Sequence, residues 1–411
     1  MSFIADFHIH SKYSRATSKS MDVPNLSLWA KRKGLNLLGT GDFTHPAWLD
    51  ELKTYLKPLD NGLFGHDNLN YILTTEVCNI FFKDGKTRKI HNIIFAPSFE
   101  IVEKLNRQLQ KYADLNSDGR PIFGSLSARE LLEIVLRTSE DCFLVPAHIW
   151  TPWFSLFGAN SGFDTIEECF GDLAEYIWSL ETGLSSDPAM NWRLSKLDRY
   201  SLISNSDAHS PSKLGREANI LDCPLDYHSI IETLKTKDRT KFLLTVEFFP
   251  QEGKYHYDGH RNCNVLLSPA EAKLNRNICP ICGRKVTIGV MHRVEDLADR
   301  PEGFLPGNRI PFRNLIPLIE VIADALGVSA TSKGAEKEYN SLVEKLGNEF
   351  DILMNVPRED LLHNTSSNIA QGILAVRESK VNITPGYDGV YGKIEIAKTP
   401  LAGESPQLSL F

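Results

Sequence analysis

Short apolar runs alternate with amphipathic segments from residue 1 to about residue 245. The runs include FIADFHIH, LNLLGTGDF, NYILTTEVCNIFF, IHNIIFAP, CFLVPAHI and YSLISNSDAHS, and helix-like segments such as SARELLEIVLRTS lie between them. Such alternation of strand and helix patterns is typical of parallel β/α units. The sequence therefore predicts an α/β fold for a first domain over residues 1–250.

Residues of the types that bind metal ions gather at the ends of these predicted strands. They are His8, His10, Asp42, Glu76, His148, Asp207 and His209, with His91 at the start of the strand HNIIF. Side chains two positions apart in a strand share a face, so His8 and His10 present two imidazoles side by side. Parallel β/α folds assemble their sites at the carboxyl ends of the strands. We therefore expect these side chains to lie together.

A cluster of imidazoles and carboxylates without a thiolate suits two or three divalent ions, such as zinc, manganese or magnesium. Glu76 is the residue that can bridge two ions with its two oxygens. Two ions about 3.5–4 Å apart can activate a water molecule and neutralise the charge of a phosphoryl transition state. The cluster therefore predicts phosphoester hydrolysis.

Six motifs in order, FHIHSKYS, GTGDFTHP, TTEV, IHNIIF, VPAHI and SNSDAH, resemble those of the polymerase and histidinol phosphatase (PHP) family. The resemblance implies a distorted seven-stranded (βα)7 barrel with its metals at the strand ends. It implies one ion on His8, His10, Glu76 and Asp207, a second on Glu76, His91 and His148, and a third-site role for His209. Asp207 and Glu76 are then the expected catalytic carboxylates.

The chain departs from the PHP pattern at the third-ion positions. Arg15 stands where many members have an aspartate, and Phe43 stands where they have a histidine. A cation cannot bind a metal, so the third ion is left open, with Asp42 and His45 as candidate donors. Arg15 is instead a candidate catalytic residue that holds a phosphate oxygen through its planar donor fork. The alternative is a solvated surface arginine.

A second cluster of ligand-type residues lies in a predicted module over residues 251–300. His260 and Cys263 are followed by Cys279 and Cys282, a spacing that fits a closed tetrahedral zinc site of structural type. His256 is a competing fourth ligand. The other cysteines are scattered singly, which does not indicate a disulfide framework.

Residues 301–397 show helical spacing in NLIPLIEVIADALGV, AEKEYNSLVEKLG and SSNIAQGILAVRES. Together with the PHP motifs and the cysteine module, this region resembles the endonuclease Q family over essentially the whole chain. The resemblance implies a helical DNA-binding domain. It also implies an enzyme that nicks DNA on the 5′ side of deaminated bases (uracil, hypoxanthine, xanthine) and of abasic sites.

Reading a deaminated base requires that the base leave the helix and meet donors aimed at its new carbonyl oxygen. Candidate donors are the backbone N–H groups of the glycine-rich segments 157–162 and 385–392. The aromatic run 150–157 is a candidate stacking surface, with core packing as the alternative.

The last segment, residues 398–411, is a polar tail that ends in QLSLF. This pentapeptide resembles the motif by which bacterial repair proteins hold the β sliding clamp. The clamp-binding residues are expected to be Gln407, Leu408, Ser409, Leu410 and Phe411.

Composition leaves other function classes open. The net charge of −7 argues only weakly against a nucleic-acid partner, because carboxylates that bind cations make the formal charge misleading. No apolar run approaches the roughly 20 residues of a membrane span, so we expect a cytoplasmic protein with no membrane partner. The alternatives are a small-molecule phosphatase of histidinol-phosphatase type and a non-catalytic clamp-associated scaffold.

Overall fold

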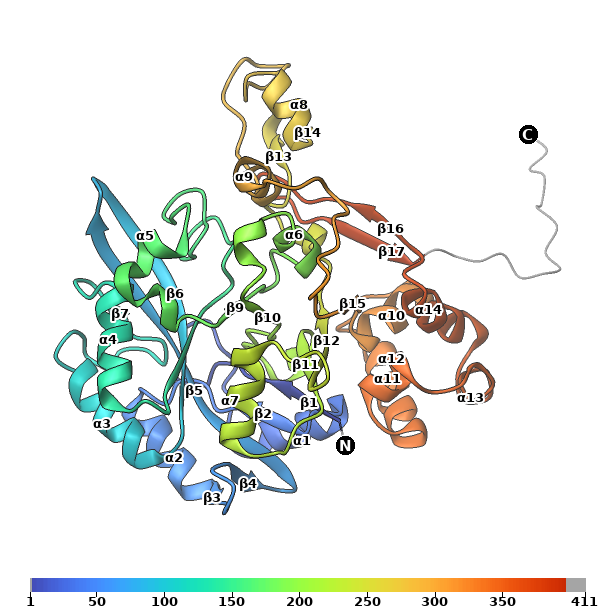
Figure 1. The fold of residues 1–411 in the computed structure, drawn as a ribbon. Helices are drawn as coiled ribbons and strands as arrows, with labels where there is room; N and C mark the ends of the chain where they lie inside the picture. Colours follow the sequence, from blue (N-terminus) through green and yellow to red (C-terminus); the bar gives the residue numbers. More distant parts are fainter. Residues whose placement is uncertain (1, 397–411) are drawn as a thin grey trace, which may run out of the picture. The chain divides into compact units, whose positions relative to one another are not determined.

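The computed structural model describes residues 2–396 (Figure 1). They form two compact units. The first unit runs to Asn314 and includes Pro385–Lys393, and the second comprises Leu315–Thr384 and the chain from Ile394. The predicted module 251–300 lies inside the first unit, and the second unit begins at Leu315 where residue 301 was expected. Within the described residues, no helix is long and apolar enough to cross a membrane.

An eleven-stranded sheet forms the framework of the first unit. Its main path is β15 (Phe312–Asn314), β12 (Phe242–Glu247), β11 (Ala218–Leu221), β1 (Phe3–Asp6), β2 (Leu37–Gly39), β5 (Leu69–Lys83), β4 (Phe64–His66) and β3 (Lys57–Pro58). Two further strands, β6 (Lys86–Ala96) and β7 (Ile122–Phe123), pair with β5, and β8 (Phe143–Pro146) pairs with β6. A separate parallel pair consists of β9 (Ser179–Glu181) and β10 (Ser201–Ile203).

The fold is α/β, as predicted, but the strand directions are mixed where parallel β/α units were expected. β1 pairs with β2 in parallel and with β11 antiparallel, and β6 pairs antiparallel with both β5 and β8. Asp84 and Gly85 join β5 to β6 with φ angles of 53° and 74°, the left-handed pair that a two-residue hairpin turn requires. The closed seven-stranded barrel stays a prediction, because β9 and β10 pair with each other outside the main sheet.

Seven α-helices accompany this sheet within the described part of the chain before residue 250. They are α1 (Val23–Lys33), α2 (Pro46–Tyr55), α3 (Phe99–Leu109), α4 (Ala128–Thr138), α5 (Ile166–Phe170), α6 (Pro188–Asn191) and α7 (Tyr227–Thr236). Local sequence explains their ends: Ser127 and Glu130 form a capping box at the start of α4, and Asp22 caps α1. Figure 1 shows α3 and α4 alongside the β5–β6 hairpin, which they contact.

The main core of the first unit is apolar and buried, with Phe7, Phe95, Phe143, Tyr227 and Phe242 among its large side chains. These residues come from β6, β8, α7 and β12 and from the end of β1. Burial of these large aromatic side chains removes much apolar surface from water and so stabilises the core. The residues that follow β1 and β8 are therefore held in place by strands packed into this core.

The segment after residue 250 contains β13 (Asp258–His260), β14 (Val265–Leu267), α8 (Pro269–Leu274) and α9 (Val290–Leu297). Its own buried cluster consists of Val265, Leu267, Ala272, Cys279 and Val286. Such a small core needs a staple, which agrees with the predicted structural metal.

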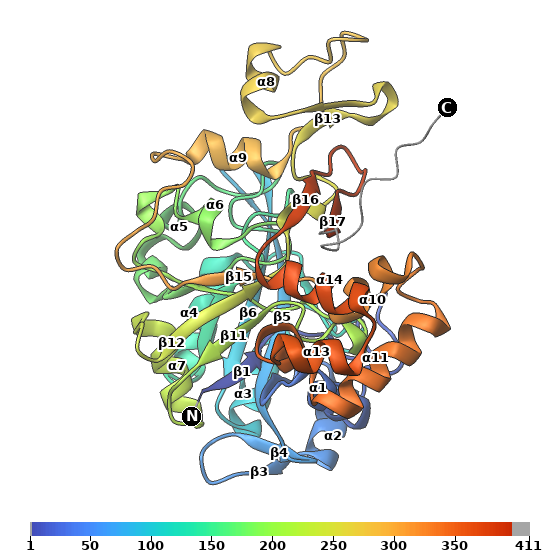
Figure 2. The same cartoon turned by 90° about the vertical axis from the view of Figure 1, so that its right-hand side faces the viewer.

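The second unit is helical, as predicted. It contains α10 (Leu318–Leu326), α11 (Lys333–Leu346), α12 (Glu349–Met354), α13 (Arg358–Asn364), α14 (Ser367–Arg377) and the strand β16 (Val381–Thr384). It also contains all but the first residue of β17 (Lys393–Ile396). Figure 2 shows α10, α11, α13 and α14 gathered together. The predicted clamp-binding pentapeptide 407–411 lies outside the described residues.

Candidate metal centre

Most of the expected ligand residues follow directly after strands, as predicted. His8 and His10 come after β1, Asp42 after β2, His148 after β8 and Asp207 after β10. Asp42, His148 and Asp207 have φ angles of 48°, 29° and 47°. Non-glycine residues rarely adopt this left-handed region, and they do so most often where a site imposes the conformation. Each turn redirects the chain at the point where a strand ends.

Glu76 and His91 are exceptions, because they lie inside the long strands β5 and β6. The prediction that Glu76 ends a strand is therefore wrong. Glu76 is paired with Ile93, and Cys78 is paired with His91. Glu76 and His91 are thus diagonal neighbours on one face of the hairpin, within reach of each other.

Four side chains form the first ligand group: His8, His10, Glu76 and Asp207. The Nε2 atom of His10 lies 3.2 Å from Glu76 Oε2 and 3.1 Å from Asp207 Oδ1. The Nε2 atom of His8 lies 3.6 Å and 3.7 Å from the same two oxygens. All four residues thus direct one ligand atom at a common point.

Glu76, His91 and His148 form the second ligand group. Glu76 Oε1 lies 2.6 Å from His91 Nδ1 and 3.0 Å from His148 Nε2, and the two ring nitrogens are 3.2 Å apart. One oxygen of Glu76 therefore faces each group, which is the arrangement of a bridging carboxylate.

The atoms of the first group fit a divalent cation. His8 Nε2, His10 Nε2 and Asp207 Oδ1 are buried without a hydrogen-bond partner, although Asp207 Oδ1 lies within 4 Å of both ring nitrogens. Buried polar atoms are normally satisfied, and a cation satisfies all three together. In the second group, burial lowers the pKa of His91 to about 4, although the charge and hydrogen bond of Glu76 oppose the shift. Burial alone would also lower the pKa of His148, but its hydrogen bond to Glu76 and the Glu76 charge raise it.

Asp42 lies behind His10, outside both ligand groups. Its Oδ1 atom is 3.0 Å from His10 Nδ1, and its Oδ2 atom accepts hydrogen bonds from Ser11 N, Ser11 Oγ and Ser14 Oγ. Burial alone would raise the pKa of Asp42, but the charge and hydrogen bond of His10 lower it. A carboxylate in this position orients the ring whose other nitrogen binds the metal, so the prediction of Asp42 as a direct ligand is corrected.

Glu181, at the end of β9, has the same relation to His8 and was missed. Its two oxygens lie 3.0 and 3.1 Å from His8 Nδ1. They also accept hydrogen bonds from the backbone N–H of His148 and from Asn205 Nδ2, each at 2.8 Å. The signal was an acid at the end of the apolar run EYIWSLETG.

Two other candidates for a third ion, His45 and His209, are members of neither group. His45 Nε2 donates to the carbonyl of Asn116 at 3.2 Å, and its ring stacks on Tyr13. His209 lies beside His10, with ring centroids 4.5 Å apart, and its Nδ1 atom contacts the Asp207 carbonyl. Within residues 2–396, the structure brings the barrel candidates into two groups and no third.

Arg15 does not reach the cluster, which corrects its predicted place. Its side chain is 76% exposed, and its Nε atom pairs with Asp118 Oδ2 at 3.0 Å. The cation at the cluster is Arg120, whose Nη1 atom donates to Glu76 Oε2 at 3.0 Å. Burial alone would raise the pKa of Glu76, but charges that include those of His91 and Arg120 hold it well below its usual range. No sequence pattern connects Arg120 to the other motifs.

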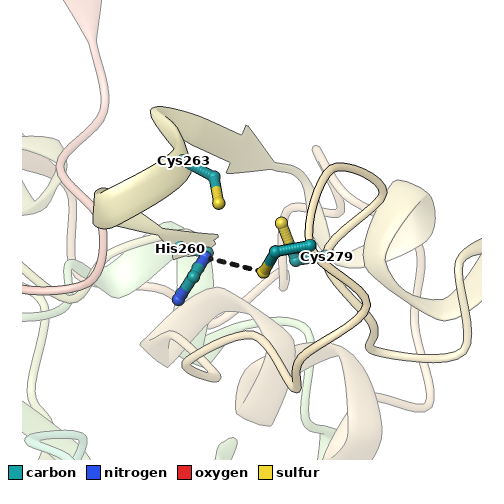
Figure 3. Close-up of side chains that lie close together, drawn as sticks. His260, Cys263 and Cys279 are labelled. Atoms are coloured by element: carbon teal, nitrogen blue, oxygen red, sulfur yellow. Dashed lines mark hydrogen bonds between the residues drawn. The ribbon is translucent and has the colours of Figure 1, made fainter.

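The cysteine cluster assembles as predicted from His260, Cys263, Cys279 and Cys282. Figure 3 shows His260, Cys263 and Cys279 turned toward one another, and His260 Nδ1 lies 3.4 Å from Cys282 Sγ. Burial alone would raise the pKa of Cys279, but hydrogen bonds from the N–H groups of Cys282 and Ile281 lower it to about 6, which favours the thiolate that binds zinc. His256, the competing ligand, is outside this group.

An aromatic pocket of about 620 Å³ adjoins the metal centre. Its lining includes Trp153, Phe154, Tyr255 and Tyr391, together with Arg216. Arg216 donates to the carbonyls of Ser206 and Asp207 at 2.8 and 3.3 Å, which connects the pocket wall to the ligand Asp207.

Two groups expected to read a base, Trp150 and the backbone N–H groups of segment 157–162, are already engaged within the protein. Trp150 is core: it is 1% exposed and donates to Asn191 Oδ1. In segment 157–162, the N–H groups of Phe157, Gly158 and Gly162 donate to nearby backbone carbonyls. The glycines allow tight packing, since a Cβ on Gly162 would lie 2.5 Å from Gly158 N.

Comparison with known proteins gives the following matches. Residues 317–380 match the family model of the MJ0043 C-terminal domain. The chain is 33% identical over 264 residues to the uncharacterized protein MJ0043 of Methanocaldococcus jannaschii, which covers 62% of this chain but only 32% of that protein. It is 28% identical to the uncharacterized protein YqxK of Bacillus subtilis, over 95% of this chain and 98% of that protein.

Two solved structures are similar over nearly the full length. One is the lesion-specific endonuclease PfuEndoQ from Pyrococcus furiosus, with 33% identity, a TM-score of 0.88, and coverage of 99% of this chain and 98% of that chain. The other is endonuclease Q in complex with a 27-mer duplex that carries an abasic lesion at the active site. It has 34% identity, a TM-score of 0.85, and 97% coverage of each chain.

Proposed function

Because the chain belongs to the endonuclease Q family, we propose that it is a DNA repair endonuclease that hydrolyses the phosphodiester bond 5′ to a lesion. The lesions are deaminated bases (uracil, hypoxanthine, xanthine) and abasic sites. One observation supports the chemistry most directly: the two oxygens of Glu76 face two separate groups of ligand atoms. This is the donor set that a two-metal phosphoesterase requires.

The two ligand groups would each hold a divalent ion, zinc or alternatively manganese or magnesium. When bound, such ions activate water and neutralise phosphate charge. Glu76 holds the two sites in register, and Glu181 and Asp42 fix the rings of His8 and His10. Asp207 is the ligand of the first group with the most exposed side chain, at 27%, and it would orient the attacking water from the open side. The cysteine cluster would hold one structural zinc.

The aromatic pocket would receive the lesion nucleotide after it leaves the helix. Ring faces suit a base because stacking tolerates any base, and Trp153 and Tyr255 lie edge to face with centroids 5.6 Å apart. Replacement of Trp153 by alanine should therefore weaken binding of uracil-containing DNA. The cysteine module and the helical unit would contact the flanking DNA backbone.

The test is cleavage of a 5′-labelled oligonucleotide that carries one uracil, with p-nitrophenyl phosphate assayed in parallel. We expect one cut on the 5′ side of the uracil, loss of that cut in Asp207→Asn, and no cut in the undamaged strand. Hydrolysis of the nitrophenyl ester alone would favour the small-molecule phosphatase. Activity on neither substrate would favour the scaffold.

We propose the β sliding clamp as a protein partner through Gln407–Phe411. A short extended peptide with a few apolar anchors is a common form of such binding. Deletion of residues 407–411 should abolish co-elution with a bacterial β clamp and leave cleavage of a short oligonucleotide unchanged. Co-elution of the truncated protein would contradict this role.

A further inference from the structure

We propose that Arg120 is a catalytic residue that binds a non-bridging oxygen of the scissile phosphate. This inference rests on the proposed function, since it takes the substrate to be a phosphate ester. Arg120 thus takes the role that the sequence suggested for Arg15.

The loop before Arg120 is built to fit against the metal centre. Gly119 lies so close to the ligand-orienting residues that a Cβ there would be 2.3 Å from both Asp42 Oδ2 and Ser14 Oγ. Its N–H donates to the Tyr13 carbonyl at 3.1 Å, and its carbonyl accepts a hydrogen bond from Thr44 Oγ1 at 3.2 Å. Only glycine fits this position, so the place of the next residue is fixed.

Asp118 secures the other side of the same loop. Its Oδ1 atom accepts hydrogen bonds from the backbone N–H groups of Arg120 and Arg15, at 3.2 and 3.3 Å. Its Oδ2 atom pairs with the Arg15 guanidinium. Arg15 therefore anchors the loop that supplies Arg120, which explains why a cation in the first motif does not itself enter the site.

The Arg120 side chain combines a fixed anchor with free donors. Its Nη1 atom donates to Glu76 Oε2, the same oxygen that faces His8 and His10. The Arg120 side chain makes no other hydrogen bond within residues 2–396. Most of the five N–H donors of its guanidinium therefore remain available. The side chain is 31% exposed, so a ligand can reach these donors from solvent.

Arg120 is better placed to bind a phosphate than the neighbouring Arg216. A phosphate held between the two ligand groups would lie beside Glu76 Oε2 and within reach of the guanidinium fork, which matches phosphate geometry. Arg216 also lies near the ligand Asp207, but its Nε and Nη2 atoms donate to the carbonyls of Ser206 and Asp207 and not to a ligand side chain. The competing explanation is that Arg120 only holds Glu76 in position for the metals.

Titration of the metal-loaded enzyme with inorganic phosphate separates these roles. A charged hydrogen bond is worth about 1.5–3 kcal/mol, so Arg120→Gln should weaken phosphate binding by roughly 10- to 100-fold. Arg120→Lys keeps the charge but not the planar donor fork, so its phosphate affinity should lie between those of the wild type and Arg120→Gln. The matched control is Arg137→Gln, because Arg137 is 80% exposed on α4. This variant should bind phosphate with the wild-type affinity.

Metal content, measured by mass spectrometry on the same samples, decides between the two explanations. Under our proposal, Arg120→Gln keeps the wild-type metal content and melting temperature. Loss of metal in parallel with phosphate affinity would show that Arg120 acts through Glu76 and would overturn the proposal, as would unchanged phosphate affinity. If Arg120→Gln does not fold, Arg120→Lys decides by the same two measurements.

Single-turnover cleavage of the uracil oligonucleotide extends the test to the reaction. Removal of one donor to transition-state charge costs about 100- to 1,000-fold in rate, and we expect a loss of that size for Arg120→Gln. The phosphate titration does not depend on the lesion. If the wild type fails to cut uracil DNA but binds phosphate through Arg120, the proposed function fails and the role of Arg120 stands.

Discussion

The carboxylate of Glu181 holds the ring of His8 with both oxygens, at 3.0 and 3.1 Å from Nδ1. The same carboxylate accepts the backbone N–H of His148 at 2.8 Å. One buried acid therefore orients a ligand of the first group and fixes the backbone of a ligand of the second.

Replacement of Glu181 by alanine should lower metal affinity at both sites. Loss of a carboxylate that orients a ligating histidine typically costs about 10- to 100-fold in affinity or activity. The measurement is metal retained per chain after dialysis against increasing chelator, with cleavage rates on the same samples. Full metal retention in Glu181→Ala would contradict the role assigned to this residue.

Gly183→Ala should reduce activity through His148. Gly183 has φ +63°, and a Cβ there would lie 2.4 Å from His148 Cβ, so the ligand must shift. We expect kcat/KM to fall at least tenfold, on the order of the loss from a displaced ligand. Gly303→Ala is the matched control, because Gly303 has φ +80° and nothing within 4 Å of an added Cβ. It should cost about 1 kcal/mol of stability and leave kcat/KM unchanged. Equal kinetics for the two variants would contradict the prediction.

The parts of the site that the sequence predicted are those with a local signal. His8, His10, His148 and Asp207 follow apolar runs that end in turns, so their strand-end places could be read directly. Glu76 could not be placed, because NYILTTEVCNIFF does not show where its strand ends. The Asp84-Gly85 pair is a hairpin signal that predicts antiparallel β5 and β6, and it was overlooked.

Cys279→Ser should release about one zinc ion per chain. It should also expose residues 251–300 to limited proteolysis, because the buried cluster of five residues around Cys279 is too small to fold alone. Cys142→Ala is the control, since Cys142 is a buried thiol outside the cysteine cluster. Unchanged zinc content in Cys279→Ser would refute a structural site.

Glu247→Gln should make stability less dependent on pH. Glu247 is fully buried at the end of β12, and burial raises its pKa from 4.5 to about 8. The folded state therefore binds a proton that the unfolded state releases near pH 4.5, and stability is lost as the pH rises from there through about 8. Glutamine keeps the neutral form at every pH.

The test of Glu247→Gln is the melting temperature between pH 5 and pH 9, a range chosen around the pKa of about 8. We expect the variant to melt roughly 1–2 °C above the wild type at pH 9 for each kcal/mol gained. Glu232→Gln, a change at an exposed glutamate on α7, should follow the wild-type curve. A variant curve parallel to the wild type would show that Glu247 is already charged in the folded protein.

Residues brought in by loops were beyond prediction for a physical reason. Arg120 and Glu181 act on ligands 44 and 173 positions away in the chain, through the hydrogen bonds to Glu76 and His8. No periodic pattern or motif spacing in a single sequence indicates that residues so far apart are in contact. Arg15, by contrast, has a motif position but is turned outward by Asp118.

Glu76 belongs to both ligand groups, and the other residues of the two groups are synthesised at different times. The second group is complete once His148 has been synthesised, whereas the first group joins His8 to Asp207, close to both ends of the first 210 residues. Chains begin to fold from the N-terminus during synthesis. A nascent chain therefore contains all three residues of the second group before Asp207, the last residue of the first group, has been synthesised.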